Sequence, residues 1–108
     1  MKREDFFKLL ESNQDVIVFF LTATWCVPCQ TIKSYVLEKA SQYEITFLQL
    51  DADQDSDVYS LLKTKKQMKG VPSLLAYKKN NVSFNANLSI SGTNKNEIDC
   101  FFDSLDFL

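Results

Sequence analysis

The chain has 108 residues, of which 45% are hydrophobic and 13% aromatic, and its formal net charge is −2 at pH 7. This length and composition predict one small domain, residues 1–108, with a single buried core. The slight negative charge argues against a nucleic-acid surface. No apolar stretch is long enough to span a membrane, and none has the form of a signal peptide. We therefore expect a cytoplasmic protein.

The first predicted elements are a helix and a buried strand. Arg3–Ser12 places its apolar side chains on one side of a helix, which predicts that this side faces a core. Val16–Leu21 is an uninterrupted run of six apolar, mostly β-branched or aromatic residues, typical of a strand buried on both faces in a parallel sheet. The polar turn Thr22–Thr24 follows, and a helical pattern then runs from Val27 to about Gln42.

Two cysteines begin this second helix, in the sequence Trp25-Cys26-Val27-Pro28-Cys29. Because the two cysteines are three residues apart in the first turn of a helix, their side chains lie on the same face and are close enough to form a disulfide. Cys26 stands where free N–H groups and the helix dipole favour an anion, which lowers the pKa of its thiol. We expect Cys26 to attack a substrate disulfide and the deeper Cys29 to resolve the mixed disulfide. Pro28 suits the first helical turn, where no N–H is needed.

A cysteine pair at this spacing is also half of a common zinc site. A structural zinc ion needs four ligands, and the chain has no histidine and one further cysteine, Cys100. The combination of strand, short turn, Trp-Cys-x-Pro-Cys and helix therefore favours redox chemistry, and we expect no metal.

The middle of the chain predicts a strand, an acidic turn and a third helix. Ile45–Leu50 reads as the strand, and the acidic run Asp51–Asp57 is expected to end it and to cap a helix from Val58 to about Met68. A calcium loop is not favoured, because serine and leucine replace the glycine and the glutamate that such a loop requires. Four lysines near the end of this helix either complement its dipole or form a basic rim that favours acidic substrates: Lys63, Lys65, Lys66 and Lys69.

The last third predicts a hairpin and a final helix. Ser73–Lys78 reads as a strand, and a tight turn with two asparagines follows it. Apolar and polar residues then alternate from Val82 to Ile90, which predicts one long strand with a buried and a wet face. The last helix, about Asn94 to Asp106, places Cys100 on its outer side as an idle surface thiol or a site of modification.

These features in this order resemble the thioredoxin family over nearly the whole chain. The matching pieces are the buried strand, the Trp25–Cys29 motif, Leu50–Asp53, Gly70–Ser73 and the glycine before the last helix. The resemblance implies an α/β fold in which Pro72 is a cis-proline facing the disulfide and Val71 offers its backbone to an extended substrate. The residues implied to bind substrate are Trp25, Val27, Pro28, Val71, Pro72 and Gly92.

Two departures from the family pattern carry expectations. The usual strand before the first helix has no counterpart, so we expect a four-stranded mixed sheet flanked by helices on both faces, with Ile45–Leu50 at an edge. Phe20 stands where many thioredoxins bury an aspartate, and the position of that aspartate's lysine partner is Gln49. This substitution removes the usual proton route to the resolving cysteine.

The sequence thus predicts a thiol–disulfide oxidoreductase that reduces protein disulfides and takes part in cell redox homeostasis. No bound cofactor is needed, and a reductase or a small dithiol recycles the pair. Two other functions stay open: a thioredoxin-fold binding module with incidental redox activity, and a thiol oxidant that passes disulfides to partner proteins. The exposed edge allows either a monomer or a weak edge-strand dimer.

Overall fold

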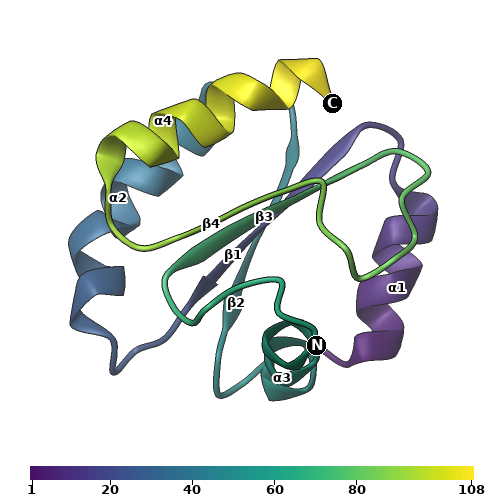
Figure 1. Cartoon of the computed structure of the whole chain (residues 1–108), viewed down its shortest axis with the longest axis horizontal. Coiled ribbons are helices and arrows are strands. Elements are labelled where there is room, and N and C mark those ends of the chain that lie inside the picture. Colours follow the sequence, from purple (N-terminus) through teal and green to yellow (C-terminus); the bar gives the residue numbers. More distant parts are fainter.

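The structure is a computed structural model that describes residues 1–108. In chain order its elements are α1 (Arg3–Ser12), β1 (Val16–Thr22), α2 (Val27–Ser41), β2 (Thr46–Asp51), α3 (Ser56–Thr64), β3 (Ser73–Lys78), β4 (Leu88–Ser91), α4 (Lys95–Ser104) and a short 3-10 helix, η1 (Leu105–Phe107) (Figure 1). None of the helices has both the length and the apolar character that a membrane crossing requires.

The four strands form one mixed sheet in the order β2-β1-β3-β4. β1 runs parallel to β2 and antiparallel to β3, and β3 pairs with β4 in the antiparallel sense. The predicted α/β fold with a four-stranded mixed sheet is therefore confirmed. The expected position of β2 is confirmed as well, since β1 is its single neighbour in the sheet.

Helices cover both faces of the sheet, and each face has its own core (Figure 1). All seven residues of β1 are buried, because alternate side chains point into the two cores. Val18 and Phe20 belong to the core under α2 and α4, whereas Ile17 and Phe19 belong to the core under α1 and α3. The uninterrupted apolar run of β1 is thus explained by burial on both sides.

The helix α3 ends at Thr64, four residues before the predicted end at Met68. The chain leaves the helix through two closing bonds, from Gln67 N to the Leu62 carbonyl at 2.9 Å and from Lys66 N to the Lys63 carbonyl at 3.1 Å. This pairing is the Schellman motif, whose penultimate residue adopts a left-handed conformation. Lys66 has that conformation, with φ of 59°, where glycine is the usual residue.

The prediction of one long strand from Val82 to Ile90 is wrong, because β4 spans Leu88–Ser91 alone. Leu88 packs on the α2/α4 core, whereas Phe84 packs on the opposite, α1/α3 core. A continuous strand would place both side chains on one face, so the strand has to break between them. Polar side chains make the break: Asn87 Oδ1 accepts the backbone N–H of Lys78 at 2.9 Å and the side-chain amide of Asn81 at 2.8 Å.

Candidate active site

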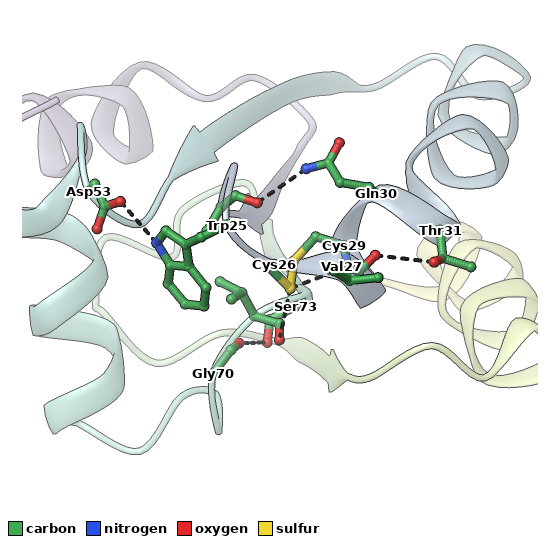
Figure 2. The surroundings of a disulfide bond; sticks show 11 residues. Trp25, Cys26, Val27, Cys29, Gln30, Thr31, Asp53, Gly70 and Ser73 are labelled. Atoms are coloured by element: carbon green, nitrogen blue, oxygen red, sulfur yellow. Dashed lines mark hydrogen bonds between the residues drawn. A yellow bond between two sulfur atoms is a disulfide. The ribbon is translucent and has the colours of Figure 1, made fainter.

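The turn between β1 and α2 presents the cysteine motif at the carboxyl end of a central strand. Cys26 is the N-cap residue of α2, with extended backbone angles, and its N–H donates to the carbonyl of Ala23 at 3.2 Å. The side chain of Gln30, one turn into the helix, donates to the same carbonyl at 3.1 Å (Figure 2). These two hydrogen bonds therefore connect the turn after β1 to the first turn of α2.

Cys26 and Cys29 are joined by a disulfide, with their Cα atoms 5.3 Å apart. The two sulfurs have different surroundings. Cys26 is 6% exposed and its Sγ accepts the N–H of Cys29 at 3.2 Å, whereas Cys29 is completely buried. The sulfur of Cys26 thus lies at the positive end of the α2 dipole with a backbone donor already directed at it. Cys100 is exposed and lies outside the pair.

The loop before β3 brings a second chain segment against the disulfide. The bond between Val71 and Pro72 is cis, as the resemblance implied, and Pro72 is buried. The carbonyl oxygen of Val71 lies 3.9 Å from the Sγ of Cys26. Two residues predicted to bind substrate therefore lie beside the cysteine pair.

Gly92, also predicted as a substrate-binding residue, lies next to this loop. Its N–H donates to the carbonyl of Pro72 at 2.9 Å, and its φ of 110° lies in a region that a side chain rarely tolerates. The bond joins the end of β4 to the cis-proline loop. The backbone conformation thus favours glycine at this position, independently of the substrate-binding role that the resemblance implies.

A pair of serines, not predicted from the sequence, holds the same loop in place. Ser73 Oγ donates to the carbonyl of Gly70 (Figure 2). It also lies 2.7 Å from Ser91 Oγ, which accepts the N–H of Lys69 at 3.3 Å. These bonds link the cis-proline loop to β4. Two serines 18 residues apart give no sequence signal, because only the pairing of β3 with β4 brings them together.

The outer rim of the site is apolar and exposed. Trp25 and Val27 are 62% and 74% exposed, and they flank Cys26 on both sides in the chain. The indole N–H of Trp25 donates to Asp53 Oδ2 at 2.9 Å and so fixes the ring beside the disulfide (Figure 2). The remaining predicted residue, Pro28, is exposed and occupies the first turn of α2, next to Val27 in the chain.

Asp53 is a site residue whose individual role was not predicted from the sequence. Its loop is ordered by Asp51, whose carboxylate accepts the N–H groups of Asp53 and Gln54 at 2.8 and 3.0 Å. The donors at Gln54 and Asp53 hold the pKa of the Asp51 carboxyl below its ordinary value. The acidic run after β2 therefore shapes the loop that positions Trp25.

The buried residues of the core beside α2 include no carboxylate and no lysine. Phe20 is completely buried there, among apolar residues that include Ile32 of α2 and Ile98 of α4. Gln49 is its partner in the register of β1 and β2, and it is exposed. The structure thus places both residues as predicted, and the carboxylate and amine common in the family have no substitute in this core.

A cysteine pair at a helix N-terminus, set against a cis-proline on a mixed sheet, defines the thiol–disulfide oxidoreductases of the thioredoxin fold. A family model described as Thioredoxin matches residues 1–103. The chain therefore belongs to the thioredoxin family.

Similar proteins agree with this assignment. Thioredoxin-2 of Saccharomyces cerevisiae is 36% identical over 70 residues, which are 64% of each chain, so the match spans slightly less than two thirds of that relative. Putative thioredoxin-5 of Dictyostelium discoideum is 31% identical over 80 residues, 71% of this chain and 72% of the relative. Among solved structures, a Plasmodium falciparum thioredoxin superposes with a TM-score of 0.76 at 22% identity, over 95% of this chain and 93% of the other. This last likeness concerns the fold.

Proposed function

We propose that this protein reduces disulfides in other proteins, with Cys26 as the nucleophile and Cys29 as the resolving residue. The observation that carries the proposal is the asymmetry of the pair: the residue Cys26 is 6% exposed, and Cys29 is completely buried. The N–H of Cys29, 3.2 Å from Cys26 Sγ, and the N-terminus of α2 both stabilise a thiolate on Cys26 after reduction.

The reaction follows from these positions. The Cys26 thiolate attacks one sulfur of the substrate disulfide, and the other substrate sulfur leaves as a thiolate that takes up a proton. Cys29 loses its proton and attacks Cys26 Sγ, which releases the second substrate sulfur as a thiolate and then a thiol. Two electrons pass to the substrate, and the protein is left with the Cys26–Cys29 disulfide that the structure contains.

The surroundings support binding of an extended polypeptide. Trp25 and Val27 give an exposed apolar rim, and Val71, Pro72 and Gly92 form the backbone border on the other side of the disulfide. A substrate segment lying along Val71 would bring its own disulfide to Cys26 Sγ. Pro28 contributes by stiffening the turn that carries both cysteines.

The turnover requires an electron donor, which we propose is a reductase or a small dithiol in the cytoplasm. No cofactor enters the proposed cycle, because thiol–disulfide exchange moves both electrons between sulfurs. Cys-Val-Pro-Cys resembles the motifs of reducing thioredoxins, whose potential is about −270 mV, more than those of isomerases near −180 mV. A reducing role is thus favoured over an oxidising one.

The test is reduction of a protein disulfide with dithiothreitol as donor. Cys26→Ser should abolish the activity, and Cys29→Ser should accumulate mixed disulfides through Cys26. Cys100→Ser is the matched control, since this exposed thiol lies outside the pair, and it should keep the wild-type rate. Full activity of Cys26→Ser would refute the proposal. A measured potential near that of a strong oxidant, about −120 mV, would instead support disulfide donation.

A further inference from the structure

An open hollow lies between the end of α3, the edge strand β4 and the start of α4. It has a volume of about 670 Å³. We use the name lysine hollow for this hollow and for six of the residues that line it: Lys63, Lys66, Lys69, Ser89, Ser91 and Glu97. We propose that the lysine hollow binds an acidic segment of the substrate polypeptide, close to the disulfide that Cys26 attacks. This inference rests on the proposed function.

The positive charges of the hollow have no carboxylate partner within the chain. Its three lysines are exposed, and none has a carboxylate oxygen within 4.0 Å, since the ion pairs of the protein are Met1–Asp55, Arg3–Asp57 and Lys39–Asp99. Glu97 is the one acidic residue in the lining. Three positive charges without a carboxylate partner thus gather in one concave place on a chain whose net charge is −2, and only Lys63 has an aromatic contact, with its Nζ 5.6 Å from the centre of the Tyr59 ring. Such a cleft attracts the opposite charge.

The dipole of α3 does not account for these lysines. A favourable interaction with the dipole falls off within the last turn of a helix, and α3 ends at Thr64. Lys69 lies five residues beyond that end. Lys65, at the helix end, is directed elsewhere, because its Nζ lies 5.3 Å from the centre of the Phe84 ring. The dipole therefore explains Lys63 and leaves Lys66 and Lys69 without a structural role.

Lys66 also occupies a position where lysine is unfavourable. Its φ of 59° lies in the left-handed region, at the helix-ending position that glycine usually fills. Nothing near it offers the charged group a partner that would offset this cost. A charged side chain at a sterically unfavourable backbone position, beside a hollow, indicates a contact with another molecule.

The hollow is close enough to the disulfide to receive the same substrate segment. Lys69 lies two residues before Val71, and the carbonyl oxygen of Val71 is 3.9 Å from Cys26 Sγ. Two residues of chain span at most about 7 Å, so with the 3.9 Å contact the backbone of Lys69 lies within about 11 Å of the reacting sulfur, roughly three residues of extended substrate. Ser91 accepts the N–H of Lys69 and contacts Ser73, which holds the wall of the hollow against the cis-proline loop.

The chemistry of the lining selects an acidic occupant. An extended substrate rises about 3.3 Å per residue, so side chains roughly three to six residues from its cysteine reach the lysines. Carboxylates of aspartate or glutamate there would pair with ammonium groups that have no carboxylate partner within the chain. Glu97 would repel them at one border and so orient the segment toward the lysines.

The test compares two disulfide-bonded peptides that differ in one flank, a run of about four glutamates or of four glutamines. The wild type should show a kcat/KM about tenfold higher for the glutamate peptide at low salt, and the ratio should approach one at about 0.5 M NaCl. The combined variant Lys63→Gln, Lys66→Gln and Lys69→Gln should lose the preference. Equal rates for the two peptides with the wild type would overturn the proposal.

A matched variant separates a local site from the overall charge. Lys8→Gln, Lys78→Gln and Lys79→Gln remove the same three charges from exposed positions outside the hollow, and this variant should keep the preference. Equal loss in both variants would overturn the proposal, because it would show a long-range field without a site.

Binding of the glutamate peptide with serine in place of cysteine, followed by fluorescence anisotropy, needs no redox step. If the wild type binds this peptide but does not reduce the disulfide-bonded peptides, the proposed function is overturned and the lysine hollow stands. If the wild type reduces the disulfide-bonded peptides but binds the serine peptide no better than its glutamine counterpart, the lysine hollow is overturned and the proposed function stands.

Discussion

Phe20 stands where many thioredoxins bury an aspartate, and it keeps the core under α2 and α4 apolar. It is completely buried in the α2/α4 core, and that core offers no carboxylate to accept a proton from Cys29. Under the proposed mechanism the proton has to pass to water or to a leaving substrate thiolate. An apolar surrounding also disfavours the thiolate of Cys29 itself. Resolution of the mixed disulfide is therefore the step in which this chain should differ from relatives with a buried aspartate.

Phe20→Asp should speed the release of mixed disulfides near pH 7, because it places a proton acceptor in the core. The same change should lower the free energy of unfolding by about 3 kcal/mol or more, since it removes a buried ring and buries a carboxyl group. Stopped-flow resolution kinetics and urea unfolding measure the two effects. Phe20→Leu, which stays apolar, is the control. Identical resolution rates in all three proteins would show that proton transfer is not limiting.

Lys66 offers a second single-residue experiment, because its backbone and its charge act in opposite directions. Lys66→Gly should raise the free energy of unfolding by about 0.5–1 kcal/mol, since glycine adopts the left-handed conformation without steric cost and loses part of that gain through its freer unfolded chain. The variant should at the same time weaken the preference for glutamate peptides. Thermal unfolding and peptide kinetics give the two readings. Lower stability would mean that the lysine side chain makes a stabilising contact.

At the scale of elements, β2 is an edge strand with little protection. It has one neighbour, β1, and its sequence Thr46–Asp51 has no proline and no internal charge. Phe47 and Leu48 are only partly buried. Strands of this kind tend to pair with another chain unless a further segment covers them.

We expect pairing through β2 to be detectable as concentration-dependent hydrogen exchange. Amides of residues 46–51 that are not bonded to β1 should exchange rapidly in dilute protein and become protected as the concentration rises. Edge-to-edge pairing buries limited area, so the dimer should be weak. Phe47→Lys, which places a charge on the partly buried edge, should abolish the concentration dependence. Exchange that is rapid at every concentration would identify a monomer.

The elements predicted correctly are those whose signals are local. The run in β1, the proline and cysteines at the start of α2 and the bounds of α1 all depend on neighbours along the chain. The break before β4 could not be predicted, because the alternation from Val82 to Ile90 is a correct strand pattern. The strand is nevertheless interrupted by the side-chain hydrogen bonds of Asn87 and by the packing of Phe84 in the opposite core.

The features of the site likewise differ in whether the sequence carries a local signal for them. The cysteine pair belongs to a short motif that the residues themselves indicate, whereas the cis-proline was expected from the resemblance to the thioredoxin family. The bond from Trp25 to Asp53 and the contact of Ser73 with Ser91 join residues 28 and 18 positions apart. No spacing rule indicates such contacts, and the lysine hollow likewise requires β4 to lie beside the end of α3.

At the scale of the whole molecule, polar contacts on the surface tie the helices of each layer together. Tyr35 of α2 donates to Asp99 of α4 at 2.5 Å, and Arg3 of α1 pairs with Asp57 of α3 at 2.9 Å. The first bond lowers the pKa of Asp99, and contacts from Arg3 lower the pKa of Asp57. Both carboxyls therefore bind protons more readily in the unfolded chain.

Stability should accordingly fall with acid. A carboxyl whose pKa is lowered by folding stabilises the native state above its unfolded pKa, and this contribution is lost as the pH falls through the folded value. The free energy of unfolding should thus be level near neutral pH and decline below about pH 4. Tyr35→Phe, followed by urea unfolding from about pH 7 to about pH 2.5, should be less stable at neutral pH and converge with the wild type in acid. A constant difference across the range would contradict this linkage.

The bond between Trp25 and Asp53 has an optical consequence. Trp25 is the one tryptophan of the chain, and it precedes a cysteine of the disulfide. Disulfides quench indole emission at short range, so light emitted by this ring reports the oxidation state of the neighbouring sulfurs. The anchoring bond holds the ring in a fixed place, and the brightness of the native protein therefore serves as an internal gauge of its redox state without any added dye.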